Sequence, residues 1–162
     1  MKRFIPWMWT LTLVLIALDR VTKILILHSD SLPATIIPGF FTLVHVTNTG
    51  IAFGVFSGIS PSIMNPVLTG IGILVLIFLA YFLLFQDETV PVRIAMHLLL
   101  AGAAGNIWDR MAYGKVIDFI DLHLGNHHWP SFNIADASIS TGLILILILS
   151  FRKSTSRVPQ AD

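Results

Sequence analysis

GNIWDRMAYGKVIDFIDLHLGNHHWPSFNIAD, residues 105–136, is the polar centre of an otherwise apolar chain. Apolar runs lie on both sides of this stretch, which contains four of the nine acidic residues: Asp109, Asp118, Asp121 and Asp136. A charged side chain at the centre of a membrane span costs roughly 2.5 to 3.5 kcal/mol on insertion scales. Aspartates kept beside so much hydrocarbon therefore indicate a functional site.

The composition of the whole chain is that of an integral membrane protein. Of 162 residues, 55% are hydrophobic and only 12% are charged, about half the charged share of a typical soluble domain. The net charge of +1 gives no reason to expect a nucleic-acid partner. The absence of cysteine excludes disulfides, thiolate metal sites and a cysteine nucleophile. Without an internal repeat or a linker, we expect residues 1–162 to form a single membrane domain.

Apolar runs predict four transmembrane helices, over about residues 4–27, 66–85, 92–110 and 134–151. A helix of twenty residues is about 30 Å long and crosses a bilayer. The first run follows a basic start, but no small-residue cleavage site comes after it, so we expect it to be retained. In the third run, the small residues at 101–105 predict close helix packing.

Two further segments interrupt the helical pattern. Residues 41–46 are rich in β-branched and aromatic side chains and predict a strand, followed by a turn at 47–50 and a returning strand at 51–56. We expect a small β-element over about 36–58 on the outer surface, and an amphipathic interfacial segment over about 115–129. The predicted fold class is an all-α membrane protein, a four-helix bundle with these two additions.

The distribution of basic residues predicts cytoplasmic termini. Four spans place both ends of the chain on one side, and Lys115 alone lies clearly in an opposite loop. The basic residues on the side of the termini are Lys2, Arg3, Arg93, Arg152, Lys153 and Arg157.

With this topology, polar residues of spans one, three and four gather at the outer membrane boundary. We expect one site there rather than scattered anchoring charges. Asp19 and Lys23 are four residues apart, so they share a helix face and can pair. This pair either anchors the end of the helix or braces the site. His97, within the third run, is expected to be a packing residue.

Asp118 and Asp136 are the candidates for a catalytic pair. Asp118 lies in the apolar frame Val-Ile-Asp-Phe-Ile, and Asp136 lies in the first turns of the last span. Two carboxyl groups in a dry site share a proton. Such a pair can activate a water for attack on a carbonyl and protonate the leaving amine. Asp109 and Asp121 compete with them, although Asp109, adjacent to Arg110, suits a structural ion pair better.

Other chemistries fit these residues less well. His123, His127 and His128 come without an HExxH motif, and an interfacial position explains them, so we expect no metal and no cofactor. A proton-coupled transporter is the main alternative, because aspartates inside membranes often relay protons. Against it, the polar groups do not continue to the inner side and no inverted repeat is present. A structural or binding protein is the third alternative.

Five blocks of this chain resemble, in order, the bacterial lipoprotein signal peptidases, also called type II signal peptidases. The blocks are Asp19 with Lys23, the segment NTGIAFG at 48–54, residues 102–110, VIDF at 116–119 and FNIAD at 132–136. The third block departs from the family pattern GGAxGNxxDR at Ala101, where the family has glycine. Trp108 is also bulkier than the aliphatic residue expected there.

The resemblance implies an aspartyl protease of the bacterial cytoplasmic (inner) membrane, with its active site near the periplasmic face. It would cleave the signal peptide from prolipoproteins just before a cysteine that carries a diacylglyceryl group, so its partners would be these precursors and membrane lipid. By position, Asp118 and Asp136 would be catalytic, and Asp19 with Lys23 would brace the site. The residues that would line or support it are Asn48, Gly50, Asn106, Arg110, Asn133 and Ala135.

Overall fold

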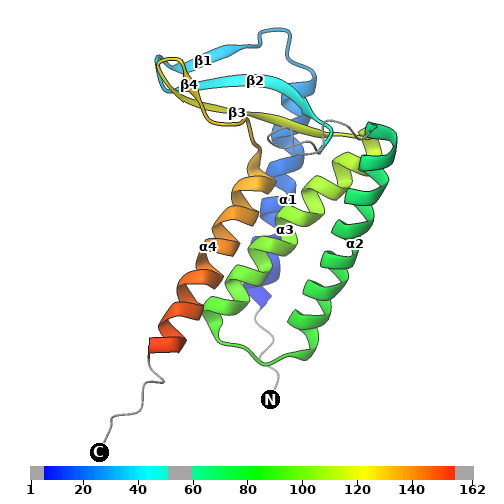
Figure 1. Ribbon diagram of the computed structural model, residues 1–162, viewed down its shortest axis with the longest axis vertical. Coiled ribbons are helices and arrows are strands. Elements are labelled where there is room, and N and C mark those ends of the chain that lie inside the picture. Colours follow the sequence, from blue (N-terminus) through cyan, green and yellow to red (C-terminus); the bar gives the residue numbers. More distant parts are fainter. Residues whose placement is uncertain (1–5, 51–59, 156–162) are drawn as a thin grey trace, which may run out of the picture.

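Helices and an antiparallel sheet form two layers, with the sheet lying across one end of the helical bundle (Figure 1). The structure, a computed structural model, describes residues 6–50 and 60–155. Its helices are α1 (Pro6–Leu27), α2 (Pro61–Phe85), α3 (Val90–Tyr113) and α4 (Ile134–Thr155). Its strands are β1 (Ala34–Ile37), β2 (Phe41–Asn48), β3 (Val116–Leu124) and β4 (His127–His128).

Three of these helices are long and apolar enough to cross a membrane, over Pro61–Phe85, Val90–Tyr113 and Ile134–Arg152. Helix α1 is also long, with 22 residues, but Asp19, Arg20 and Lys23 interrupt its hydropathy. Asp19 and Lys23 are buried against the rest of the bundle. The outward surface of α1 is apolar, with Leu13 and Leu25 about two-thirds exposed, at 66% and 65%.

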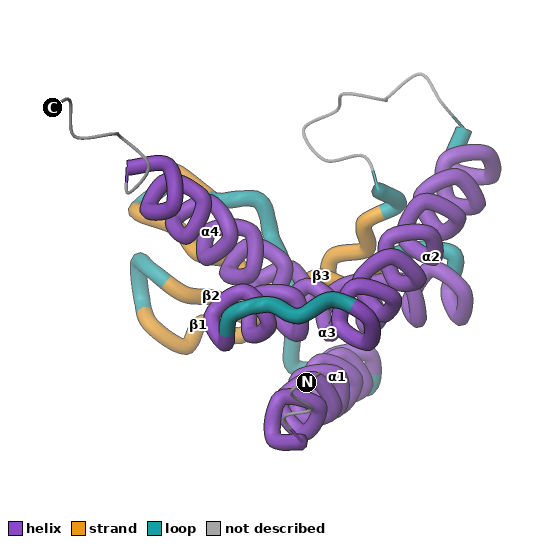
Figure 2. Tube along the Cα trace, turned by 90° about the horizontal axis from the view of Figure 1, so that it is seen from below, coloured by secondary structure: helices purple, strands orange, loops and turns teal. Residues whose placement is uncertain are grey.

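Helix α3 lies at the centre of the bundle and packs against each of the other three helices (Figure 2). Two glycines of α3 allow its neighbours to pack close to its backbone. A Cβ atom on Gly102 would lie 2.3 Å from the carbonyl oxygen of Ala135, and one on Gly105 would lie 2.7 Å from Asp19 Oδ2. The predicted packing through small residues is confirmed. It brings α3 into contact with the beginning of α4 and with the polar face of α1.

The sheet has the order β1-β2-β3-β4, and all of its neighbouring strands are antiparallel. Strand β2 confirms the predicted strand at 41–46 and extends it to Asn48. Its backbone pairs with β3, where Val46 lies opposite Asp118 and Asn48 lies opposite Val116. Residues 51–56, predicted as a returning strand, lie outside the described residues.

The segment at 115–129, predicted as an amphipathic interfacial segment, contains strands β3 and β4. Residues 116–119 and 121 of β3 are buried, so the strand is covered on both faces and lacks the half-polar alternation that identifies a surface strand. Its pairing partner β2 lies far away in the chain. The sheet is therefore larger than the predicted β-element.

Helix α2 begins at Pro61, earlier than the predicted start at residue 66, and Pro66 lies inside it. Proline is tolerated in the first turn of a helix because the N–H groups there have no intrahelical partner. Pro66, one turn further on, removes one helical hydrogen bond without ending the helix. Helices α3 and α4 also extend beyond the predicted spans.

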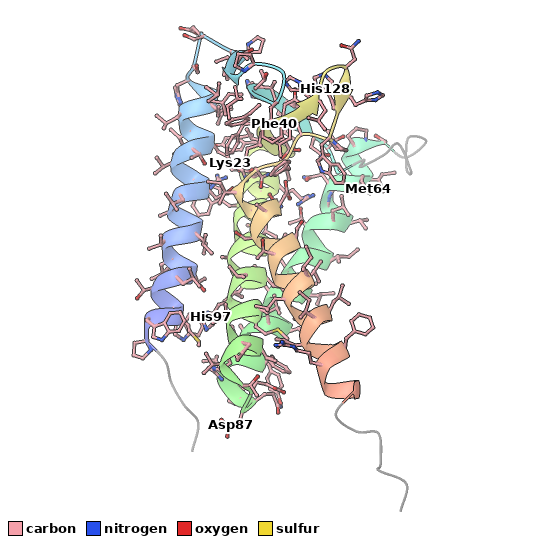
Figure 3. The ribbon with its side chains drawn as sticks, turned by 90° about the vertical axis from the view of Figure 1, so that its left-hand side faces the viewer. Lys23, Phe40, Met64, Asp87, His97 and His128 are labelled. Carbon is pink, nitrogen blue, oxygen red and sulfur yellow. The ribbon has the colours of Figure 1, made fainter. Side chains whose placement is uncertain are left out.

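The end of the bundle opposite the sheet is closed by two buried side chains of α3. Arg93 donates to the carbonyl oxygens of Leu83 and Gln86, at 3.0 and 3.3 Å, and so caps the end of α2. His97 is fully buried, and its Nδ1 lies 2.9 Å from Thr12 Oγ1. His97 lies near this end, whereas Lys23 lies near the sheet (Figure 3). His97 is thus the packing residue that was predicted.

Candidate active site

The beginning of helix α4 positions Asp136. Asn133 is the residue before the helix, and its Oδ1 accepts the backbone N–H of Asp136 at 2.8 Å. The carboxyl group of Asp136 accepts the backbone N–H of Asn133 at 3.2 Å. These reciprocal bonds form a capping box, which uses two of the N–H groups that a helix leaves unpaired at its start. Asp136 is therefore held at the positive end of the helix dipole, which favours a carboxylate.

Asp118 is the third residue of β3 and is only 2% exposed. Two asparagine side chains hold its carboxyl group: Asn48 donates to Oδ2 at 3.1 Å, and Asn133 donates to Oδ1 at 2.8 Å. Asn48 is placed by the pairing of β2 with β3. Its own Oδ1 accepts the N–H of Gly50 at 2.7 Å, in a turn where Gly50 has a φ of +93°.

Asn133 therefore contacts both carboxyl groups, Asp118 through its side-chain amide and Asp136 through its backbone and Oδ1. Asp118 and Asp136 line one cleft of about 620 Å³, together with residues of β2 and of the segment Trp129–Phe132. Such a cleft has room for a peptide segment. Neither the sheet nor the bundle forms this site alone, because β3 supplies one carboxyl group and α4 the other.

The electrostatics of the cleft favour the protonated form of Asp118. Burial raises the pKa of Asp118 to about 6, and the nearby charge of Asp136 acts in the same direction. The amides of Asn48 and Asn133 and the charge of Lys23 oppose this rise. Near neutral pH, Asp118 can therefore both release and hold a proton, which is what a general acid–base group requires.

Asn106 of α3 connects the cleft to a buried charge cluster. Its Nδ2 donates to Asp136 Oδ1 at 2.7 Å. Its Oδ1 accepts from Asn133 at 3.2 Å and from Lys23 Nζ at 3.4 Å. Both ends of the Asn106 amide are thus used, and this fixes which way it faces. The orientation leaves an N–H for the Asp136 carboxylate.

The charge cluster itself contains two acids and two bases. Lys23 Nζ lies 2.9 Å from Asp19 Oδ2 and 2.7 Å from Asp109 Oδ2, so the predicted Asp19–Lys23 pair is present. Arg20 forms ion pairs with the same two aspartates. Asp19 also accepts the N–H of Ala135 at 3.0 Å. The cluster therefore joins α1 and α3 to the first turn of α4.

The competing aspartates lie outside the cleft. Asp109 was expected to pair with its neighbour Arg110, but Lys23 and Arg20 are its ion-pair partners, and its Oδ2 also accepts the N–H of Ile117 at 3.2 Å. Asp121 contacts His128 Nδ1 through both carboxyl oxygens, at 2.9 and 3.0 Å. Within the described residues, no group of three or more His, Asp or Glu side chains could hold a metal ion.

The remaining predicted residues lie around this network. Arg110 is close enough to Asp136 and Asp118 for their charges to act on its guanidinium group. Ala135 is buried beside Gly105. A side chain on Gly105 would collide with Ala135 and with Asp19. Trp108 is 60% exposed, so its bulk does not disturb the packing of α3.

Two contributors were given no role in the site from the sequence. Arg20 bridges Asp19 and Asp109, and Asn65 donates to the carbonyl oxygen of Arg110 at 3.3 Å. The polarity of Asn65 within an apolar helix was the available signal for the second residue.

Comparisons with known proteins agree on one family. The chain matches the signal peptidase (SPase) II family over residues 11–152. It is 38% identical over 142 residues to the lipoprotein signal peptidase of Desulforapulum autotrophicum, covering 83% of this chain and 85% of that protein. It is 38% identical over 152 residues to the lipoprotein signal peptidase of Ralstonia nicotianae, covering 91% and 85%.

Two solved structures of bacterial membrane enzymes have a similar fold. A bacterial membrane enzyme determined by the in meso method at 2.3 Å resolution superposes with a TM-score of 0.84 at 32% identity, covering 99% of this chain and 97% of that one. A second bacterial membrane enzyme, determined by the same method at 1.9 Å, has a TM-score of 0.78 at 35% identity and covers 91% and 94%.

Proposed function

The chain belongs to the signal peptidase II family, and we propose that it cleaves prolipoprotein signal peptides as an aspartyl endopeptidase whose catalytic pair is Asp118 and Asp136. The observation that carries this proposal is the double contact of Asn133, which ties both carboxyl groups to one cleft. The family assignment leaves the alternative of a proton-coupled transporter without support.

The reaction follows from one protonated and one ionised carboxyl group. The ionised group takes a proton from a water in the cleft, and the water oxygen bonds to the scissile carbonyl carbon. The protonated group, assigned to Asp118 because burial raises its pKa to about 6, donates its proton to the carbonyl oxygen. The C–N bond of the tetrahedral intermediate then breaks. The leaving nitrogen takes the proton that Asp136 received from the water, and one hydroxyl group of the intermediate returns a proton to Asp118, which restores both carboxyl groups to their starting states.

The amides around the pair hold the carboxyl groups in fixed positions during these steps. Asn48 and Asn133 donate to Asp118, and Asn106 donates to Asp136. A donor that is already aimed at a carboxylate needs little rearrangement when its charge changes. We assign these three asparagines to positioning the pair. Arg110 faces the same two charges and supports the site electrostatically.

We propose that the scissile bond immediately precedes a cysteine that carries a diacylglyceryl group. Cleavage of this bond separates the signal peptide from the lipidated protein. We place the enzyme in the bacterial cytoplasmic membrane, with both termini cytoplasmic and the sheet on the periplasmic side. Helix α1 is proposed as the fourth span, because its charges are paired inside the bundle and its outward side chains are apolar.

Cleavage of a synthetic precursor in detergent tests this proposal. The full chain is incubated with a diacylglyceryl-modified precursor and with the same precursor carrying an unmodified cysteine. Mass spectrometry of the products should show a new N-terminus at the lipidated cysteine and much slower turnover of the unmodified form. Asp118→Asn serves as the inactive control. A cut at another bond, or equal turnover of the two precursors, would contradict the proposed specificity.

A further inference from the structure

Ser140 lies on helix α4, one turn after Asp136, and lines the same cleft. Residues four apart in a helix share one face, so the two side chains are neighbours on the wall of the cleft. The side chain of Ser140 is exposed. It presents a hydroxyl group beside one carboxyl group of the proposed catalytic pair, and the proposed mechanism gives this hydroxyl group no role.

The hydroxyl group of Ser140 differs from the others on α4. Ser138, Thr141 and Ser150 each donate to the carbonyl oxygen four residues earlier, at 2.7 to 2.9 Å. Such a bond within the helix satisfies the hydroxyl group without any other partner. Among the hydroxyl side chains within residues 134–152, that of Ser140 alone makes no hydrogen bond to a described residue. Its donor is therefore available to a group in the cleft.

Ser140 also marks the boundary between the polar cleft and the apolar part of α4. Helix α4 begins beneath the sheet and runs away from it (Figure 1). Four helical residues rise about 6 Å, so Ser140 lies about that much further from the sheet than Asp136. Beyond it, Leu143 and Ile146 line a separate pocket of about 410 Å³ whose walls are all apolar side chains of α2, α3 and α4. Ser140 is thus the cleft residue that lies furthest along α4.

A signal peptide, the substrate class of the proposed function, brings a polar group that matches this donor. Its apolar part crosses lipid as a helix, because lipid offers no partner to free backbone N–H and C=O groups. The helix has to end before the scissile bond, so that a water can reach the carbonyl carbon. At the end of a helix the last four carbonyl oxygens have no intrahelical partner. A hydroxyl donor at this point replaces one of the missing N–H groups.

We propose that the hydroxyl group of Ser140 donates to a backbone carbonyl oxygen of the signal peptide shortly before the scissile bond. An extended chain advances about 3.3 Å per residue, so the rise from Asp136 to Ser140 corresponds to about two residues. The carbonyl oxygen is then that of the third residue before the cysteine. Ser140 binds the substrate and takes no part in proton transfer. The inference rests on the proposed function and adds to it a contact that sets the register of the peptide against Asp136.

The test compares the wild-type full chain with Ser140→Ala and Ser150→Ala. Ser150→Ala is the matched control, since Ser150 is also an exposed serine of α4 but donates to Ile146 and does not line the cleft. One substrate is the diacylglyceryl-modified precursor with its normal backbone. The others carry a single thioamide at the second, third or fourth residue before the cysteine. The sulfur of a thioamide accepts a hydrogen bond more weakly than a carbonyl oxygen does.

Ser140→Ala should raise KM for the normal precursor about fivefold, the effect of one neutral hydrogen bond. The value of kcat should not change, because a contact made equally in the ground state and the transition state affects KM alone. In the wild-type protein, the thioamide at the third residue should raise KM by a similar factor. In Ser140→Ala the same thioamide should add no further rise, since the donor is already absent. Ser150→Ala should match the wild-type protein with every precursor.

The contact is excluded if Ser140→Ala keeps the wild-type KM, if it lowers kcat instead, or if Ser150→Ala shows the same rise in KM. It is also excluded if every thioamide is as harmful in Ser140→Ala as in the wild-type protein. The proposed function is contradicted by a different result, in which the wild-type protein itself does not cut the lipidated precursor before its cysteine. The two failures are therefore distinguishable.

Discussion

The side-chain amide of Asn133 donates to Asp118 Oδ1 at 2.8 Å, and so connects the cap of helix α4 to the first half of strand β3. The same residue accepts the N–H of Asp136 at 2.8 Å. One side chain thus has two separable tasks: to start a helix and to orient a carboxyl group. The second task can be removed without the first.

Asn133→Ser should separate these tasks. Serine caps a helix about as well as asparagine, but its short hydroxyl cannot also reach Asp118. We expect cleavage to fall at least a hundredfold, with a smaller loss of thermal stability than in Asn133→Ala. Alanine lacks the cap as well, a loss of about 0.5 to 2 kcal/mol. Cleavage rates and melting temperatures in detergent provide the measurement. A serine variant with more than a tenth of the wild-type rate would argue against the orienting role.

Asp118→Asn and Asp136→Asn should each abolish nearly all turnover while leaving membrane insertion unchanged. Asparagine keeps the size of the side chain but cannot exchange a proton. The double variant should be little worse than either single variant, because members of one catalytic unit are strongly non-additive. Asp121→Asn is the control, since Asp121 pairs with His128 outside the cleft and should retain most activity. If either catalytic variant cleaves at a tenth of the wild-type rate, the assignment is wrong.

The raised pKa of Asp118 predicts a pH-dependent stability. Its pKa is about 6 in the folded protein, against about 3.9 in an unfolded chain. Between these values the folded state binds more protons, so stability is fully present at low pH and decreases as pH rises to about 6. The total is at most about 3 kcal/mol, and less if other groups adjust.

The Asp118→Asn variant has no ionisable side chain at this position, so its stability does not show this decrease with rising pH. The melting temperature of the wild-type protein minus that of Asp118→Asn should therefore fall between pH 4 and pH 7 and stay constant above. Thermal unfolding in one detergent across this range gives the comparison. A difference that does not vary with pH would show that Asp118 is not perturbed by burial.

Lys23→Met should be strongly destabilising. Lys23 is fully buried between Asp19 and Asp109, and removal of one partner from a buried ion pair costs about 3 to 5 kcal/mol. Leu13→Ala, on the exposed side of the same helix, should have a much smaller effect. Expression level and melting temperature measure both variants. Wild-type stability in Lys23→Met would mean that the cluster is solvated.

Chelation should leave activity unchanged. The proposed mechanism needs only two carboxyl groups and a water, and the candidate residues around the cleft are asparagines, an arginine and small residues. EDTA treatment followed by dialysis should therefore preserve the rate of precursor cleavage. Activity that is lost with EDTA and restored by zinc would require a different mechanism.

The parts of this fold that local sequence determines could be predicted. Long apolar runs identified α2, α3 and α4, and β-branched residues identified β2. The pair of Asp19 and Lys23 followed from helical spacing alone. The cap of α4 could also have been read from Asn133 and Asp136, which stand at the spacing of a capping box.

Contacts between distant segments could not be predicted from local patterns. Strand β3 is buried on both faces, so its sequence lacks a clear alternation, and its partner β2 lies 70 residues earlier at the Asn48–Asp118 contact. Arg20 and Asp109 pair across α1 and α3, a contact set by helix packing. The apolar surroundings of Asp118 and Asp136 and the resemblance to a family both predicted that they form a pair, and the structure adds how Asn133 and Asn106 orient them.

The capping box of α4 has a consequence for the order in which the protein is made. Ribosomes synthesise the chain from its N-terminus, so Asn133 and Asp136 are the last residues of the charge and amide network to appear. In the proposed mechanism, Asp118 has no partner acid until α4 is in place, so the first three helices alone would not cleave a precursor. The growing chain would therefore remain inactive until its final helix has entered the membrane.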